Sequence, residues 1–438
     1  MIDKSVLSSL LIRHLPQQRW FGAKDQILQE VEIGVLEVVR DEWPIMLSAE
    51  VEAVMEDDSD DLYHVLVGIR PYGEHAQFLE GQVSGVIGDL DTDLGPGYAY
   101  DAARDPELAI ALFRHISPDV EPPKRARGVG TEQSNTSLVF DDEIIMKIFR
   151  RLSEGTNSDV EVTRALAAVG FKHVAEPLGE WQRGGIDLAI MQTYLAGGSE
   201  GWALALTSLR DLYDQRLEPS EAGGDFAAEA ERLGQMTAEL HDAMRRAFDQ
   251  EPADPAVWSE LMLTQLEGVS HPEIDKRAIA KVFEDLKHVD DAGPSMRVHG
   301  DYHLGQVMRT DMGWHVLDFE GEPARPFEQR RMPSSPLKDV AGMLRSLQYA
   351  TWGALTDPEQ RPVGLGAAWE ARNRQAFLDG YVAIAHGLGG ILPSDRDSMD
   401  AILRAFELDK AVYEVNYEMA NRPGWVQIPI AAINRVTS

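Results

Sequence analysis

The chain has 438 residues, 44% of them hydrophobic and 26% charged, a composition typical of soluble globular proteins. Its 41 basic and 73 acidic residues give a formal net charge of −32, which argues against nucleic acid and anionic membranes as partners. The absence of cysteine excludes disulfides, thiolate catalysis and thiolate metal sites. The amino terminus has only a short semi-apolar stretch, broken by Arg13 and His14, and no window approaches the ~20 apolar residues of a membrane span. We therefore expect a cytoplasmic protein.

The first hundred residues predict one helix followed by strands. Apolar residues recur at helical spacing over residues 2–11. Residues 31–39, 43–55 and 62–72 are rich in β-branched and aromatic residues and read as strands. The acidic segment 56–61 separates the last two strands, which predicts a hairpin with a solvated tip.

The rest of the chain predicts a β-rich part and then a helical part. Residues 106–116 favour a helix, and residues 125–196 favour two strands, a helix and two further strands. Residues 225–248 carry one continuous apolar face at helical spacing, and residues 397–421 predict another long helix. A small β-rich lobe followed by a large helical lobe is the element order of a kinase-like fold.

The strongest chemical signal is a His-Gly-Asp turn that ends at Asp301. Gln306 follows this Asp by five positions and Asp318 follows it by seventeen. Phosphoryl transfer from ATP needs a carboxylate that positions and deprotonates the acceptor hydroxyl, and oxygen ligands that hold Mg²⁺ against the phosphates. Protein kinases supply a base, an amide ligand and a metal-binding Asp in the same order. A hairpin predicted to turn at residues 311–313 would bring Asp301, Gln306 and Asp318 together.

Two further residues near this turn have alternative interpretations. His303 is either a metal ligand or base, or a residue that orients backbone or a carboxylate, and the second role is the more usual one. Glu320 follows Asp318 by two positions, so it either faces the same metal ion or forms a salt bridge in the turn. The metal itself would be Mg²⁺, because the candidate ligands are hard oxygen donors.

Lys147 lies at the centre of an apolar predicted strand, well before the catalytic turn. It matches the strand lysine that contacts ATP phosphates in kinases, with Glu161 on the next helix as its expected partner. Ser158 and Glu161 also have the spacing of a capping box, in which Glu161 would return to a backbone amide instead. Both roles for Glu161 stay open at this point.

A polar turn precedes the lysine strand and predicts contacts with the triphosphate. It lacks the glycine patterns of common phosphate-binding loops, so backbone and hydroxyl donors would replace them. The candidate residues are Ser134, Asn135, Thr136 and Ser137. A later buried strand runs into the expected hinge between lobes, where backbone groups from Thr193 to Leu195 would meet adenine.

Several motifs together resemble the maltokinases. They are HGDYHLGQV, DFEGEPARP, SPLKDVAGMLRS, EQSNTS, ELDKAVYEVNYE, NRPGWVQIP and the amino-terminal LPQQRWFGAK, which is also similar to the opening of maltokinases fused to trehalose synthase. The resemblance covers nearly the whole chain. It implies an α+β, two-lobed fold of the aminoglycoside phosphotransferase type with an N-terminal cap. It also implies ATP and Mg²⁺ as cofactors, phosphorylation of maltose to maltose 1-phosphate for α-glucan synthesis, and trehalose synthase as a possible partner.

The resemblance also assigns regions and residues. Residues 1–95 would form the cap, residues 96–200 the nucleotide-binding lobe and residues 201–438 the helical lobe with the catalytic and sugar-binding sites. In that last lobe a polar and aromatic stripe would face the sugar, since sugars bind through aromatic faces and polar partners. The stripe comprises Asp409, Lys410, Tyr413, Glu414 and Tyr417. Such a stripe is otherwise a helix face that packs within its own lobe.

Two rival functions remain. One is a kinase of the same fold for another sugar or amine, such as glucosamine or an aminoglycoside. The number of carboxylates that face the acceptor would discriminate, since a polycation site needs several, whereas a neutral disaccharide needs aromatic side chains. The other is a non-catalytic pseudokinase that binds a trehalose-converting enzyme. The presence of Asp301, Gln306, Asp318 and Lys147 argues against it, because a scaffold needs none of the four.

Overall fold

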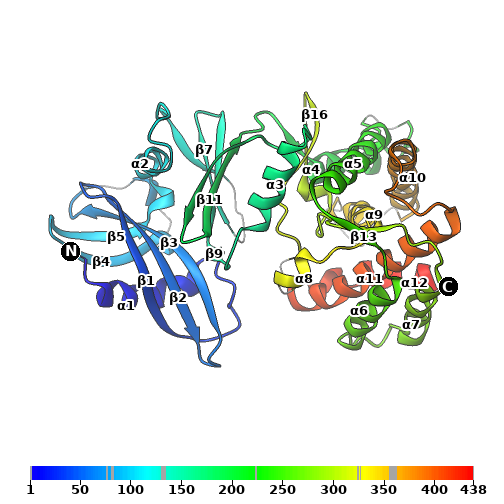
Figure 1. Ribbon diagram of the computed structural model, residues 1–438, viewed down its shortest axis with the longest axis horizontal. Coiled ribbons are helices and arrows are strands. Elements are labelled where there is room, and N and C mark those ends of the chain that lie inside the picture. Colours follow the sequence, from blue (N-terminus) through cyan, green and yellow to red (C-terminus); the bar gives the residue numbers. More distant parts are fainter. Residues whose placement is uncertain are drawn as a thin grey trace. The chain divides into compact units, whose positions relative to one another are not determined.

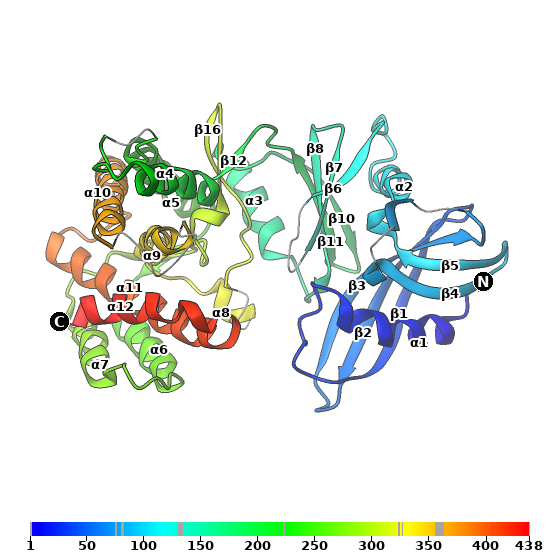
Figure 2. The same ribbon diagram turned by 180° about the vertical axis from the view of Figure 1, so that it is seen from behind.

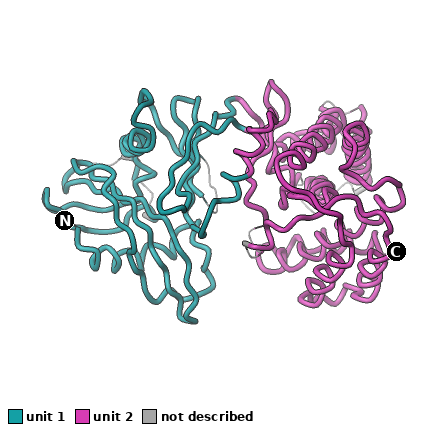
Figure 3. Tube along the Cα trace, viewed as in Figure 1, with its two compact units in different colours: residues 1–161, 175–196 teal, residues 162–174, 197–438 magenta. Residues whose placement is uncertain are grey.

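The computed structural model describes residues 2–74, 77–79, 83–129, 135–221, 224–322, 325, 327–354 and 363–437 (Figure 1). The chain forms two compact units. The first comprises residues 1–161 and 175–196, and the second comprises residues 162–174 and 197–438 (Figure 3). The chain therefore crosses between the units more than once, and each unit has its own hydrophobic core.

The first unit opens with helix α1, which packs on an antiparallel sheet. α1 spans Lys4–His14 and buries Leu7, Leu10 and Leu11 in the core beneath it. The sheet has the order β1-β2-β3-β5-β4, with β9 paired to β3. Its strands are β1 (Leu28–Arg40), β2 (Ile45–Met55), β3 (Asp60–Pro71), β4 (Val86–Thr92), β5 (Gly95–Asp101) and β9 (Arg151–Leu152). The predicted helix, strands and acidic hairpin are all confirmed.

A second sheet of the first unit carries the candidate nucleotide residues. Its order is β10-β11-β8-β7-β6. The strands are β6 (Ala126–Val129), β7 (Asn135–Phe140), β8 (Ile144–Phe149), β10 (Pro177–Arg183) and β11 (Ile186–Thr193). Three principal strands precede helix α3 (Ser158–Ala168), where the sequence predicted two. Helix α2 (Pro106–Ile116) packs on this sheet, and the ring of its Phe113 lies 5.2 Å from that of Phe140 on β7.

The second unit is mainly helical. Its helices are α4 (Gly201–Gln215), α5 (Ala227–Ala247), α6 (Pro255–Glu267), α7 (Lys276–Asp285), α8 (Phe327–Arg331), α9 (Leu337–Gly353), α10 (Val363–Leu388), α11 (Arg396–Asn421) and α12 (Gln427–Thr437). Helix α9 contacts α4, α10 and α11 (Figure 2). It is buried along almost its whole length, with Lys338 as the exception in its first two turns. A buried central helix can hold loops in place because both its faces are packed.

Two small sheets complete the second unit. Strands β15 (Val307–Thr310) and β16 (Gly313–Val316) form the predicted hairpin, and β12 (Ser199–Glu200) pairs with β15. Strands β13 (Gln250–Pro252) and β14 (Pro294–Met296) form the other sheet. Across the parts of the chain that the structure describes, no helix is both long enough and apolar enough to cross a membrane.

Candidate active site

The His-Gly-Asp turn is held by the central helix of its unit. Asp339 on α9 accepts hydrogen bonds from the backbone N–H groups of His299 (2.8 Å) and Gly300 (2.9 Å). Gly300 has φ 88°, in the left-handed region that favours glycine. The His299 ring lies 3.0 Å from the carbonyl oxygen of Leu317, which ties the turn to the end of the hairpin. The backbone that leads into Asp301 is therefore fixed by buried contacts.

Asp339 is itself part of a buried polar cluster. Its Oδ2 lies 3.2 Å from Nε2 of His241, whose Nδ1 lies 2.8 Å from the hydroxyl of Tyr381. Burial alone would raise the pKa of Asp339, but its hydrogen bonds and the nearby histidines outweigh burial and lower the pKa. The carboxylate therefore stays ionised and can accept both N–H groups of the catalytic turn.

A glycine on α9 allows the catalytic turn to pack closely. A Cβ atom on Gly342 would lie 2.6 Å from the carbonyl oxygen of Tyr302, so any larger residue would displace the chain beside Asp301. The Tyr302 side chain points away into the core, where its hydroxyl lies 2.9 Å from the Thr237 hydroxyl. The motif thus needs a small residue on a helix that lies some forty positions further along the chain.

Asp301 lies in a chain of charged groups. Its Oδ1 accepts a hydrogen bond from Lys410 Nζ at 3.0 Å, and the same ammonium donates to Glu322 at 2.5 Å. Burial alone would lower the pKa of Lys410, but Glu322 and Asp301 outweigh burial and raise it. His303 Nδ1 accepts from the Gly305 N–H, and its Nε2 lies 3.7 Å from Asp301 Oδ2. This geometry fits the orienting role for His303, and burial lowers its pKa.

The two predicted metal ligands lie side by side at the end of the hairpin. Gln306 Nε2 lies 3.3 Å from Asp318 Oδ2, and the backbone N–H of Leu317 donates to the backbone carbonyl of Gln306. Asp318 has φ 60°, an uncommon value for a residue with a side chain and one that recurs at functional sites. Glu320 follows on the same partly buried segment, and its metal role stays a prediction.

The Gln306–Asp318 pair suits Mg²⁺ better than a metal ion whose ligands all come from protein side chains. The described residues include no group of three or more His, Asp or Glu side chains placed to hold a metal ion. Mg²⁺ needs only one or two protein oxygen ligands, because it takes its remaining ligands from phosphates and water. The carboxylate of Asp318 and the amide oxygen of Gln306 are such donors.

In the first unit, Lys147 contacts an acidic residue of α3. Its Nζ lies 3.0 Å from Asp159 Oδ2, and both side chains are largely buried. Asp159 lies two residues before Glu161 on the same helix, and the roles predicted for Glu161 stay predictions. The helix is capped by Asn157, whose side chain accepts from the Asp159 N–H at 2.8 Å. Asn157 therefore occupies the capping position that the Ser158 alternative required.

The polar turn is only partly described. Ser134 lies outside the described residues, whereas Asn135, Thr136 and Ser137 open strand β7. Ser137 pairs with Lys147 across the sheet, so the start of β7 lies beside the lysine strand. The Thr136 hydroxyl accepts a hydrogen bond from Arg150 Nε at 2.9 Å, so it is engaged inside the unit. Phosphate contacts by these residues stay a prediction.

The predicted adenine segment follows strand β11. The N–H of Thr193 donates to the Glu176 carbonyl, and the N–H of Tyr194 donates to the Glu143 carbonyl. The last residue of the first unit is Ala196, so Leu195 lies next to the point where the chain passes to the second unit. The hinge role of this segment and adenine contacts by Thr193 and Leu195 stay predictions.

The predicted sugar stripe on α11 divides into two groups. Lys410 contacts Asp301, and Asp409 accepts from Gln265 Nε2 at 2.8 Å and lies 3.6 Å from Arg325. The Tyr413 ring lies beneath the Lys410 ammonium, 5.1 Å away. Lys410 thus contacts Asp301 directly, Tyr413 lies beside Lys410, and Asp409 lines one small cavity with Lys410. Sugar contacts by these three residues stay a prediction.

The remaining two stripe residues lie further along α11. Glu414 is buried and binds Arg345 at 3.0 Å, as the alternative of helix packing predicts. Tyr417 is 39% exposed and stacks on Tyr413 with ring centroids 6.4 Å apart. The Arg422 guanidinium lies over the Tyr417 ring, 5.6 Å from its centroid. Substrate contacts by Glu414 and Tyr417 stay a prediction.

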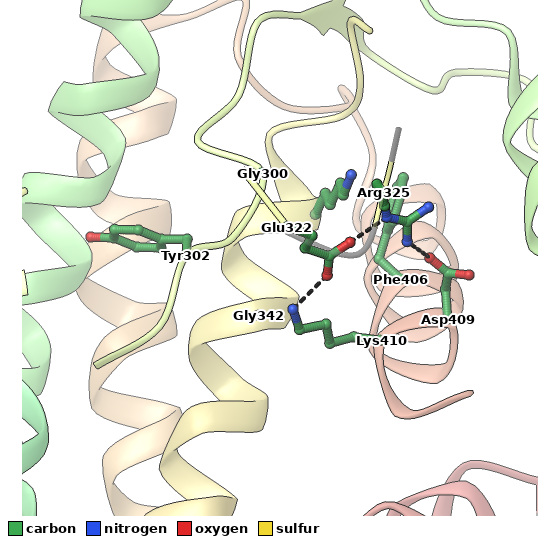
Figure 4. Close-up of a pocket in the computed structure, with 9 residues that line it drawn as sticks. Gly300, Tyr302, Glu322, Arg325, Gly342, Phe406, Asp409 and Lys410 are labelled. Atoms are coloured by element: carbon green, nitrogen blue, oxygen red, sulfur yellow. Dashed lines mark hydrogen bonds and ion pairs between the residues drawn. The ribbon is translucent and has the colours of Figure 1, made fainter. Parts of the chain in front are cut away.

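Sequence reasoning missed several residues at this site. Glu322, Arg325 and Lys338 line, with Asp409 and Lys410, a cavity of about 10 Å³, which is about the room of one water (Figure 4). Glu322 contacts Lys410 and Arg325, as the dashed lines show. The motifs DFEGEPARP and SPLKDVAGMLRS contain all three missed residues, so the signal was present without an assigned role.

The charge of Glu322 predicts an acid-sensitive fold. Burial alone would raise its pKa, but Lys410 and Arg325 outweigh burial and hold the pKa far below the usual range. Because the folded-state pKa lies below the unfolded-state value of about 4.3, this stabilisation is complete above that value and is lost as the pH falls through the folded-state pKa. We expect the free energy of unfolding in urea to fall below about pH 5, and to fall less in Glu322→Gln.

The control for this measurement is Glu328→Gln, which changes an exposed glutamate on α8. It should keep the wild-type dependence of the free energy of unfolding on pH. If the free energy of unfolding depends on pH equally in the wild type and in Glu322→Gln, the lowered pKa assigned to Glu322 is wrong.

Comparisons with known proteins agree with this geometry. Residues 125–377 match the family model described as the phosphotransferase enzyme family, and residues 14–105 match the maltokinase N-terminal cap domain. A glucosamine kinase of Streptacidiphilus jiangxiensis is 30% identical over 327 residues, or 69% of this chain and 71% of the relative. A glucosamine kinase of Mycolicibacterium smegmatis (strain ATCC 700084) is 29% identical over 322 residues, which are 70% of this chain and 78% of the relative.

Solved structures share the fold. A glucosamine kinase in complex with glucosamine, ADP and inorganic phosphate superposes with a TM-score of 0.67 at 22% identity, over 98% of both chains. A second crystal structure of a glucosamine kinase superposes with a TM-score of 0.65 at 23% identity, over 93% of this chain and 95% of the other. The predicted two-part kinase-like fold is thereby confirmed. The chain belongs to the phosphotransferase enzyme family and carries an N-terminal cap of the maltokinase type.

Proposed function

We propose that this protein transfers the γ-phosphoryl group of ATP to the anomeric hydroxyl of maltose, giving maltose 1-phosphate for α-glucan synthesis. The observation that carries the proposal is the grouping of Asp301, Lys410 and the Gln306–Asp318 pair around one turn. Cytoplasmic location, the three-region division and a trehalose-converting partner belong to the same proposal, and they rest on the resemblance to maltokinases.

Asp301 is the proposed general base. Lys410 occupies its Oδ1, so Oδ2 is the oxygen that we assign to receive the proton of the acceptor hydroxyl. His303, whose Nε2 faces the same Oδ2 at 3.7 Å, would orient the carboxylate rather than accept the proton itself. A positioned base of this kind contributes about 10²–10⁴-fold to the rate.

Other residues would bind and neutralise the nucleotide. Lys147, oriented by Asp159, would contact the ATP phosphates. Gln306 and Asp318 would hold Mg²⁺, which supplies positive charge against the phosphoryl oxygens. Transfer of the γ-phosphoryl group needs positioning and charge more than covalent chemistry, and these are the kinds of group that supply both.

The charges near Asp301 favour a neutral acceptor over a cationic one. Glu322 is bound by Lys410 and Arg325, and Glu414 is bound by Arg345. Within the described part of this site, these carboxylates already have resident cations. A protonated amine would therefore compete with a lysine or an arginine for its partner, whereas sugar hydroxyls need no free charge.

Glucosamine is the second candidate acceptor. Two relatives that share about seven tenths of this chain are named glucosamine kinases. Asp409 is the observation in its favour, because burial raises the pKa of this carboxyl and its contact with Arg325 is long, at 3.6 Å. The ammonium of a bound glucosamine could replace Arg325 as the cation that pairs with Asp409.

A panel of sugars decides between these acceptors. We expect kcat/KM to be highest for maltose, lower for glucose and glucosamine, and zero for trehalose, which has no free anomeric hydroxyl. Remote binding energy from the second ring can position the reacting hydroxyl, so a monosaccharide loses turnover as well as affinity. The measurement is ADP release for each sugar, with phosphorus NMR of the product. A preference for glucosamine, or phosphate on a primary hydroxyl, would reject maltose and retain the kinase.

A further inference from the structure

A groove in the second unit lies next to the catalytic residues and has no assigned role. It is a cavity of about 160 Å³ between helix α6, the α8 region and the first turn of α9. Its rim carries three exposed apolar side chains, Val257 (43%), Leu261 (44%) and Met332 (44%). Trp258 and Phe406 form the floor, with ring centroids 5.4 Å apart. Apolar walls with a few polar groups are typical of small-ligand sites.

The groove adjoins the cavity at the catalytic turn. Arg325, Lys338, Phe406 and Asp409 line both the groove and the small cavity that also touches Gly300 and Lys410. Because the two cavities share these four side chains, the groove begins beside Lys410, which contacts Asp301. The small cavity holds about one water, so the bulk of a second sugar ring must lie elsewhere.

Lys338 indicates what kind of ligand the groove takes. Its ammonium has no hydrogen-bond or ion-pair partner among the residues described, although its side chain is partly buried and lines both cavities. Burial lowers its pKa, and the Glu322 carboxylate offsets this only in part. A partly buried ammonium without a partner is costly unless a ligand or water supplies an acceptor. A sugar hydroxyl is such an acceptor, and it adds no charge beside Glu322, which already pairs with Lys410 and Arg325.

We infer that this groove binds the non-reacting ring of the disaccharide acceptor, with Lys338 donating a hydrogen bond to one of its hydroxyls. The inference rests on the proposed function and adds a specificity-determining residue to it. The apolar rim would contact the faces of the ring, and Lys338 would fix its orientation. The groove, rather than the catalytic turn, would then account for a preference for maltose over glucose.

The test fills the groove and removes the ammonium. Leu261→Trp adds bulk at the rim, and Leu388→Trp is the matched control, because it changes a leucine of similar exposure (40%) near the end of α10, outside the groove. We expect Leu261→Trp to lower kcat/KM for maltose about tenfold or more and to leave glucose unchanged. Lys338→Met should lower kcat/KM for maltose by about 10- to 100-fold, the range for a hydrogen bond from a charged group. Lys338→Arg should retain most activity.

Thermal unfolding of each variant identifies those that fail to fold. The groove inference is overturned if Leu261→Trp lowers kcat/KM for maltose and for glucose equally. It is also overturned if neither Leu261→Trp nor Lys338→Met changes kcat/KM for maltose. In both cases the maltokinase proposal stands. If the wild type shows no preference for maltose over glucose, the proposed acceptor fails, and the disaccharide subsite fails with it. A selective loss for maltose in both variants supports the groove.

Discussion

Asp301→Asn is expected to lower kcat by about 10²–10⁴-fold while ATP and sugar still bind. The amide has the shape of the carboxylate but cannot accept the proton of the acceptor hydroxyl. The neighbouring contacts should survive, since an amide oxygen can still accept the hydrogen bond that Lys410 donates at 3.0 Å. The measurements are kcat from ADP release and separate binding of nucleotide and sugar by calorimetry.

The control for this variant is Asp311→Asn, which removes a carboxylate from the exposed turn of the β15–β16 hairpin. It should keep wild-type turnover. If Asp301→Asn keeps more than half of the wild-type kcat, another group must accept the proton, and the assignment of the base is wrong.

Asp318→Ala is expected to abolish turnover at every Mg²⁺ concentration. It removes the one carboxylate of the predicted ligand pair, and a divalent ion held by a neutral amide alone loses most of its charge stabilisation. Gln306→Ala should also lower kcat, but raised Mg²⁺ should restore part of it because Asp318 remains. The measurement is kcat as a function of Mg²⁺ for both variants.

The two ligand variants also distinguish metal binding from folding. Gln306 and Asp318 contact each other at 3.3 Å, so either substitution removes the same contact. Any structural damage from losing that contact should therefore be similar, and only the response to Mg²⁺ should differ. If both variants lose kcat equally and raised Mg²⁺ restores neither, Asp318 is not the stronger of the two metal ligands, contrary to our proposal.

The buried network beneath the turn explains why these effects should be large. Asp339 fixes two backbone N–H groups of the turn, and Gly342 lets the turn lie against α9. A base held by packed groups loses little entropy when the acceptor binds. The Asp301 variant therefore tests the chemistry of one atom rather than the flexibility of a loop.

The sequence alone determined the elements and the chemical motif. Helices α2 and α11 and the β15–β16 hairpin are local features, set by apolar periodicity and turn residues within a few positions. The order of Asp301, Gln306 and Asp318 is also local, because a short hairpin joins them. Patterns of this kind depend on neighbours along the chain, so they can be read without the fold.

Only the tertiary structure decided which distant residues meet. Lys147 contacts Asp159 on α3, a residue that the sequence alone did not single out. Lys410 reaches Asp301 across 109 positions of sequence, and Lys338 lines the groove from a helix that is otherwise buried from Leu337 to Thr351. Such contacts depend on how helices pack against one another, and helical periodicity specifies the buried face of a helix but not its partner.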